Sequence, residues 1–179
     1  MYANITLAYT HQGNYLKALE WSDKALERCE KMLGKEHTST ATTYNNIALI
    51  YTYQGNPKAL EWYQKAVSIY EKVLGNEHPD TAITYNNIAG VYSMIGDYPN
   101  ALKWYQKALL ILERILGKEH PDIATIYNNI ALDYSRQNDY QEALEWYQKA
   151  LEIFEKILGK SHPNTQKVKR NIEVLQNGN

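Results

Sequence analysis

The sequence lacks the features that mark secreted, membrane and nucleic-acid-binding proteins. It has a single cysteine, Cys29, which excludes a disulfide framework within the chain and favours a reducing compartment. No apolar run is long enough to cross a bilayer, and no basic-then-apolar segment at Met1 marks a secretion signal. With 19 Lys+Arg against 20 Asp+Glu, no charge excess draws the chain to nucleic acid or to an anionic membrane. We therefore predict a cytoplasmic protein with no nucleic-acid or membrane partner.

Motifs of catalysis and metal binding are missing as well. The chain has no Gly-rich phosphate loop, no His-Glu-x-x-His and no nucleophile elbow. Four of its five histidines, His37, His78, His120 and His162, are periodic. If each sits on its own helical repeat, neighbours lie about 15–20 Å apart at 8–10 Å per helix contact, too far to share one metal ion. We predict that they serve helix starts or loop packing, and that the protein is no enzyme and holds no cofactor or metal.

A repeat, in contrast, runs through the whole sequence. Tyr-Asn-Asn-Ile-Ala occurs at residues 44–48, 85–89 and 127–131, and altered forms occur at 2–6 and 169–173. The second asparagine falls at positions 4, 46, 87, 129 and 171, which gives steps of 42, 41, 42 and 42 residues. A period this regular indicates one supersecondary unit that is copied and stacked. The hydrophobic content of 44% is ample for a packed core.

Each repeat is predicted to be a helical hairpin, and the third repeat shows why. Pro79 suits the first position of a helix, because the N–H that proline lacks has no partner there. Gly96 ends this helix in the left-handed conformation that glycine tolerates best. A second helix with an apolar stripe is predicted from Tyr98 to Leu116. In the fourth repeat Asn138 replaces the glycine, and asparagine is the next best residue for such a cap.

The spacing of aromatic and small residues resembles the tetratricopeptide repeat. The order is Tyr85-x-x-Ile88-Ala89-x-x-Tyr92, then Gly96, then Ala101-x-x-x-Tyr105-x-x-Ala108. The usual repeat has about 34 residues; the longer period, the paired asparagines and the Leu-Gly-x-x-His-Pro loop look like the kinesin-light-chain type. The resemblance implies an all-α fold, a right-handed α-solenoid of four helix pairs and a C-terminal capping helix. It also implies a protein or peptide as the partner.

The repeat pattern predicts a single array over residues 1–179. Its repeats span about 1–36, 37–77, 78–119 and 120–161, and a capping helix follows at 162–176. Met1 aligns with residues inside the first helix of later repeats, so we expect the array to be cut there. Polar Lys169, Arg170 and Glu173 suit a solvated terminal helix, so we expect a genuine C-terminal end. An uncapped first repeat would expose apolar surface, which predicts end-to-end self-association through the N-terminal repeat.

The resemblance places the first helix of each repeat on the concave side of the solenoid, with the asparagines facing the groove. An amide both donates and accepts hydrogen bonds, so it can hold the backbone of an extended peptide of any sequence. The predicted peptide-binding groove contains Asn4, Asn45, Asn46, Leu49, Tyr53, Asn86, Asn87, Met94, Asn128, Asn129 and Arg136. The alternative is that one asparagine of each pair bonds a neighbouring helix and fixes the packing.

Two functions stay open on the sequence alone. One is a protein-interaction module with a peptide in the groove. The other is a structural scaffold or spacer that stacks or self-associates without a dedicated ligand. The four tryptophans, Trp21, Trp62, Trp104 and Trp146, fall on second helices, where contact between repeats is favoured over stacking on bases. A reader of chaperone C-termini is not expected, because such domains need Lys or Arg where this chain has Asn45, Asn86 and Asn128.

Overall fold

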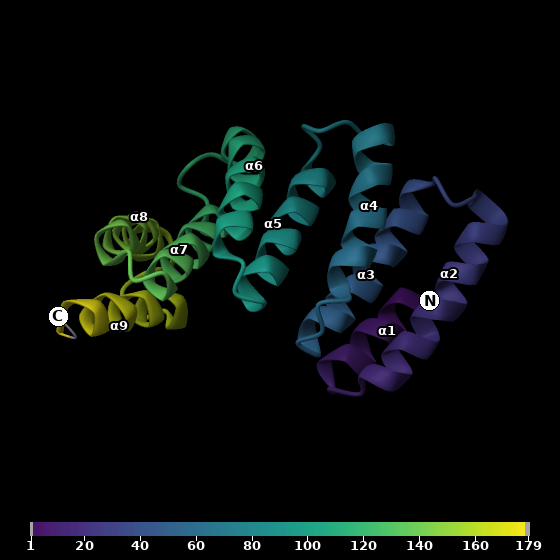
Figure 1. Ribbon diagram of the computed structural model, residues 1–179, viewed down its shortest axis with the longest axis horizontal. Coiled ribbons are helices and arrows are strands. Elements are labelled where there is room, and N and C mark those ends of the chain that lie inside the picture. The colour runs from purple at the N-terminus through teal and green to yellow at the C-terminus, as the bar shows by residue number, and fades with distance from the viewer. Residues whose placement is uncertain (1, 178–179) are drawn as a thin grey trace. The chain divides into compact units, whose positions relative to one another are not determined.

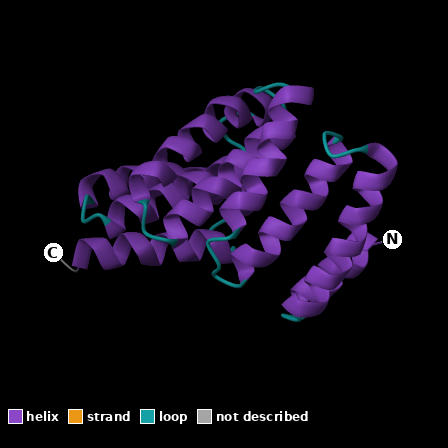
Figure 2. Ribbon diagram, turned by 45° about the vertical axis from the view of Figure 1, so that its right-hand side comes forward, coloured by secondary structure: helices purple, strands orange, loops and turns teal. Residues whose placement is uncertain are grey.

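The computed structural model describes the backbone of residues 2–177 and the side chains of residues 5–177 (Figure 1). In chain order the helices are α1 (Tyr2–His11), α2 (Tyr15–Leu33), α3 (Thr38–Tyr53), α4 (Ala59–Val73), α5 (Pro79–Met94), α6 (Tyr98–Leu116), α7 (Pro121–Arg136), α8 (Tyr140–Leu158) and α9 (Pro163–Asn177). Residues 2–177 contain no strand (Figure 2). None of the helices described there combines the length and the apolar character needed to cross a membrane.

The contacts divide the chain into two compact units. The first ends at Ile95 and holds α1–α5, and the second begins at Gly96 and holds α6–α9. Within the first unit each helix packs on the next, and α3 also contacts α1 and α5. Within the second unit α7 packs on α6 and α8, and α8 packs on α9. Each helix thus contacts near neighbours in the chain, as repeat arrays do.

We call the first helix of each repeat, α1, α3, α5, α7 and the terminal α9, a first-type helix, and the second helix a second-type helix. From α3 onward, a histidine side chain caps the start of each first-type helix. The Nδ1 atoms of His37, His78, His120 and His162 accept hydrogen bonds of 3.0, 3.2, 3.2 and 3.2 Å from the backbone N–H two residues further on. Each bond satisfies one of the N–H groups that a helix leaves without an intrahelical partner. Their predicted role at helix starts is confirmed.

The predicted helix ends are also confirmed. The third repeat has its helices at Pro79–Met94 and Tyr98–Leu116, and Gly96 between them has a φ of 82°. Asn138 has a φ of 66° and takes the place of glycine after α7. Both residues occupy the left-handed region, where the chain can leave one helix and turn into the next.

Alanines let the helices approach closely inside each unit. Ala41, Ala66 and Ala89 in the first unit have no exposed surface, and neither do Ala108 and Ala150 in the second. A methyl group is the largest side chain that fits at such points, so a bulkier residue would overpack the contact.

A hydrogen bond between a tyrosine and a glutamate links each repeat to the next. The hydroxyls of Tyr44, Tyr85 and Tyr127 donate to Glu30, Glu71 and Glu113 over 2.8, 2.7 and 2.6 Å. At the same place in α9 stands Lys169, whose Nζ lies 2.6 Å from Glu155 Oε1. The pKa of Glu155 is lowered, mainly by the hydrogen bond from Lys169. The lysine of the predicted solvating cap therefore keeps the link between repeats in a charged form.

Two of the tryptophans meet the tyrosine of their own hairpin. The ring centroids lie 5.7 Å apart for Tyr44 and Trp62, and 5.2 Å apart for Tyr127 and Trp146. A lysine ammonium covers these indoles, at 4.2 Å for Trp62 and 4.1 Å for Trp146. The sequence predicts contact between repeats, whereas these ring pairs lie within one hairpin because the tyrosine of the first helix faces the indole.

Candidate functional site

The predicted groove residues lie on the first-type helices α1, α3, α5 and α7. The side chain of Asn4 lies outside the described residues. Asn45, Asn46, Asn86, Asn87, Asn129 and Leu49 are half-buried, and Asn128 is only 7% exposed. The same five-residue motif therefore gives amides of different accessibility, because the neighbouring helix differs from repeat to repeat.

Larger side chains stand exposed in the last turn of these helices. Tyr53 at the end of α3 is 54% exposed, and Met94 at the end of α5 is 37% exposed. The Arg136 side chain at the end of α7 is 43% exposed. These three residues provide an aromatic ring, a flexible apolar chain and a guanidinium group at equivalent places of successive repeats.

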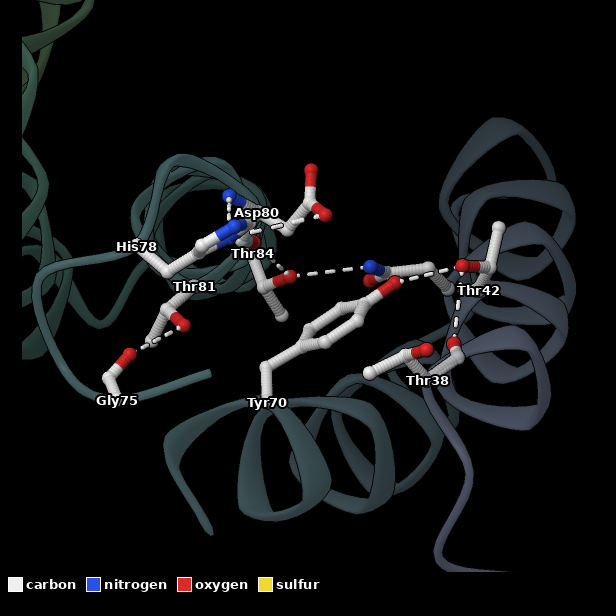
Figure 3. A network of polar contacts seen from close by, with 9 residues as sticks. Thr38, Thr42, Tyr70, Gly75, His78, Asp80, Thr81 and Thr84 are labelled. Atoms are coloured by element: carbon white, nitrogen blue, oxygen red, sulfur yellow. Dashed lines mark hydrogen bonds and ion pairs between the residues drawn. The ribbon is translucent and has the colours of Figure 1, made fainter. Parts of the chain in front are cut away.

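In the first unit Asn45 is tied to the next first-type helix. Its Nδ2 donates to Thr84 Oγ1 on α5 over 3.0 Å, and the Thr84 hydroxyl donates to the carbonyl of Asp80 over 2.8 Å. Figure 3 shows Tyr70 of α4 reaching between Thr42 on α3 and Thr84 on α5. Burial raises the pKa of the Tyr70 hydroxyl, and hydrogen bonds from Thr42 and Asn45 act against that rise. Asn45 thus holds helices together, as the packing alternative predicts, while it remains half-buried.

In the second unit the two asparagines of α7 form a chain of amides. Asn128 Nδ2 donates to Asn129 Oδ1 over 3.4 Å. Asn129 in turn donates to the hydroxyl of Tyr105, which lowers the pKa of Tyr105 against the larger rise caused by burial. The Oδ1 atoms of Asn45, Asn86 and Asn128 are all buried and accept no hydrogen bond from residues 5–177. Buried side-chain acceptors without a donor are uncommon in folded proteins.

A buried carboxylate supports Arg136. Asp133 has no exposed surface and lies 3.8 Å from Arg136 on the same helix. Its position corresponds to Ile50 and Val91, which are core residues of earlier repeats. The predicted groove does not include Asp133, although the residue breaks the apolar pattern of its own repeat and could have been found by that signal. The Asp133 carboxylate thus pairs with the exposed guanidinium three residues further along α7.

Among the hollows lined by described residues, two lie on the second unit. The larger, of about 200 Å³, is lined by Tyr127, Ile153 and charged residues such as Lys149, and Lys156 and Glu119 pair across it at 2.6 Å. The smaller, of about 90 Å³, lies between α7, α8 and α9 and includes Asn128 and Asn129. Only the smaller one contains residues of the predicted groove. Within residues 5–177 no three His, Cys, Asp or Glu side chains gather in a way that could hold a metal ion.

A family model confirms the resemblance that the sequence suggests. The model described as "Tetratricopeptide repeat" matches residues 1–59, 56–109, 82–156 and 122–171, and so covers nearly the whole chain. The family is typically one of non-enzymatic proteins that mediate protein–protein interaction. No curated protein sequence matches the chain.

Solved structures of the same fold cover almost the entire chain. BtubC (BKLC) from P. vanneervenii is similar with a TM-score of 0.87 at 23% identity, over 98% of this chain and 70% of that one. A putative kinesin light chain of Podosopora anserina, with nearly identical TPR-like repeats, gives 0.83 at 23% identity, over 98% and 84%. The apo form of RapI gives 0.82 at 19% identity, over 99% and 62%. These likenesses confirm the all-α repeat fold, which kinesin-light-chain-like repeat proteins share. By the match of the family model, the protein belongs to the tetratricopeptide repeat family.

Proposed function

We propose that this chain is a protein-interaction module that holds an extended peptide along the first-type helices of its repeats. The asparagines of α3, α5 and α7 would bond the peptide backbone, and Tyr53, Met94 and Arg136 would contact its side chains. The observation that carries the proposal is the recurrence of a buried acceptor in three repeats, Asn45 Oδ1, Asn86 Oδ1 and Asn128 Oδ1, which accept no hydrogen bond from residues 5–177. A buried acceptor without a donor is costly, so a ligand N–H that satisfies it contributes to binding.

A selection of random peptides on the full chain, followed by calorimetry, tests the proposal. We expect selected peptides to lose roughly two- to tenfold in affinity when Asn86→Ala or Asn128→Ala removes one amide, because one hydrogen bond contributes about 0.5–1.5 kcal/mol. Gln148→Ala removes an exposed amide from the second-type helix α8 and is the matched control. An unchanged Kd in both asparagine variants would refute a role for these amides.

Self-association as a scaffold is the second candidate, and exposed leucines on the first hairpin favour it. Leu7 on α1 is 49% exposed and Leu16 on α2 is 76% exposed. Apolar surface of this kind supports contact with another chain. Light scattering at rising concentration should then show growth without any ligand, and Leu7→Glu with Leu16→Glu should abolish it. A monomer at all concentrations would exclude the scaffold candidate. The cytoplasmic location predicted from the single cysteine is compatible with both candidate functions.

A further inference from the structure

An apolar side chain stands exposed in the last turn of every second-type helix. The residues are Met32 on α2, Val73 on α4, Ile115 on α6 and Ile157 on α8, at steps of 41, 42 and 42 residues. Their exposed fractions are 66, 51, 43 and 49%. The residue type changes between repeats while the apolar character is kept, although solvent contact alone favours no apolar residue there.

Leu110 on α6 shows the contrasting case of an isolated exposed apolar residue. It is 78% exposed, and its counterparts in the other repeats are Glu27, Ser68 and Glu152, which are polar and exposed as well. Single exposed apolar residues are ordinary on protein surfaces, so Leu110 needs no partner. A position that is exposed and apolar in all four repeats is a different matter, and it indicates a surface that another molecule covers.

An ion pair bridges adjacent repeats beside these apolar residues. In the first unit Lys72 Nζ lies 2.6 Å from Glu36 Oε2, and in the second unit Lys156 Nζ lies 2.6 Å from Glu119 Oε2. Lys72 directly precedes Val73, and α2 and α4 end at the same edge of the first unit (Figure 1). All four charged side chains are more than half exposed. Exposed ion pairs contribute little to stability, so these charges can exchange partners with another surface at small cost.

The order of residues along this edge is self-complementary. In the first unit it is apolar, acidic, basic and apolar, from Met32 through Glu36 and Lys72 to Val73. When a second copy is turned by 180°, its Val73 faces Met32 and its Lys72 faces Glu36. Apolar residues then cover each other and opposite charges meet, as the contact between two copies related by a twofold axis requires. The second unit repeats the order with Ile115, Glu119, Lys156 and Ile157.

We propose that each of these two edge rows binds the same row of a second copy of the chain in a twofold contact. The first row consists of Met32, Glu36, Lys72 and Val73, and the second row consists of their counterparts in the second unit. The inference goes beyond the proposed function, because neither row contains a residue of the predicted peptide-binding groove. It also differs from the scaffold candidate, which uses Leu7 and Leu16 of the first hairpin.

Other occupants fit the edge rows less well. A partner of one charge sign would be attracted by one member of the Lys72–Glu36 pair and repelled by the other. A wholly apolar partner would remove water from both charges without offering them a counter-charge. A second copy supplies apolar residues and both charges in the reversed order.

Analytical ultracentrifugation of the full chain at rising concentration tests the inference. The variant Ile115→Lys with Ile157→Lys removes the second row, and on that background the first row should give a reversible dimer and nothing larger. Adding Met32→Lys should raise the Kd of this dimer roughly tenfold or more, because the apolar contact is lost twice in a twofold dimer. Leu110→Lys is the matched control and should leave the Kd unchanged. A monomer at every concentration, or an equal effect of Met32→Lys and Leu110→Lys, would overturn the inference.

Charge reversal on the same background gives a second test, which loss of folding cannot imitate. Glu36→Lys and Lys72→Glu should each weaken the dimer, because like charges then face each other across the twofold axis. An equimolar mixture of the two variants should dimerise again, since one row then carries two lysines and the other two glutamates. A mixture that stays as monomeric as its components contradicts the inference. Selected peptides should bind these variants as they bind wild type, so failure here and failure of the proposed function remain distinguishable.

Discussion

At the scale of single residues, one neighbouring side chain decides whether an amide of the repeat motif donates a hydrogen bond to the next first-type helix. Asn45 has Thr84 as its partner, whereas Asn128 faces Val168. The difference is a hydroxyl in place of a methyl group on otherwise similar helices.

The first prediction concerns the coupling between Asn45 and Thr84. Asn45→Ala and Thr84→Val should each lower the free energy of unfolding by roughly 0.5–1.5 kcal/mol, since each removes one side of a hydrogen bond in a half-buried setting. The double variant should cost less than the sum of the two, which urea unfolding of all four proteins measures. The pair Asn45→Ala and Asn128→Ala is the control, because those residues lie in different compact units and should be additive. Additive costs at positions 45 and 84 would contradict the bond.

The second prediction concerns alkaline pH and Tyr44. Burial raises the pKa of the Tyr44 hydroxyl to about 12, and its hydrogen bond to the Glu30 carboxylate acts in the same direction. The folded pKa is above the unfolded value of 10, so this stabilisation is complete below pH 10 and is lost as the pH rises toward 12. Tyr44→Phe should cost roughly 1.5–3 kcal/mol at pH 7, the range for hydrogen bonds to charged groups.

Urea unfolding of wild type and Tyr44→Phe from pH 7 to about pH 11 checks this, with the two curves converging as the pH rises. Tyr53→Phe removes a hydroxyl from a side chain that is 54% exposed, so its curve should run parallel to wild type. A constant gap between wild type and Tyr44→Phe at every pH would show that the hydroxyl does not titrate through this contact.

At the scale of secondary-structure elements, short side-chain contacts set where each helix begins and how it joins the next. The histidine Nδ1 atoms begin α3, α5, α7 and α9, and the Tyr–Glu bonds join each second-type helix to the following first-type helix. Both contacts recur because the residues recur. In α9 the tyrosine becomes Lys169, and the contact persists as an ion pair with Glu155.

The third prediction is that His78 stabilises the first turn of α5. His78→Ala should lower the free energy of unfolding by about 1 kcal/mol, because it leaves the N–H of Asp80 without its acceptor. Hydrogen exchange at residues 80–82 should rise in the same variant. His78→Asn retains an acceptor at the N-cap and should stay close to wild type. Loss of stability in both variants alike would point to packing of the imidazole instead.

At the scale of the whole chain, the sequence alone was sufficient to predict the limits of the helices. It was insufficient to predict which side chains of other repeats surround a given residue. Proline, histidine and glycine act locally, so helix limits such as Pro79 and Gly96 followed from the sequence alone. Asn128 lines the same hollow as Val168, forty residues further along the chain, and no local motif reveals that neighbour. The division after Ile95 also depends on contacts summed over many residues, and the single array predicted over residues 1–179 stays a prediction.

The last prediction follows from this dependence on near neighbours. Ala150 on α8 has no exposed surface and lies in the second unit, and Ala66 on α4 is its counterpart in the first. Ala150→Leu should overpack α8 against its neighbours, at a cost of roughly 1–3 kcal/mol. In a repeat array the damage is carried by interfaces between adjacent elements, so hydrogen exchange should increase most in α7–α9 and least in α1–α3.

Ala66→Leu should give the mirror image, with exchange raised in α3–α5 and little changed in α8 and α9. The comparison uses the same substitution at equivalent positions, so differences in side-chain volume cancel. If both variants instead raise exchange evenly over all helices, the chain unfolds as one cooperative body. The two compact units then do not unfold independently of each other. A local response would show that each compact unit keeps its own helices ordered through contacts between adjacent elements.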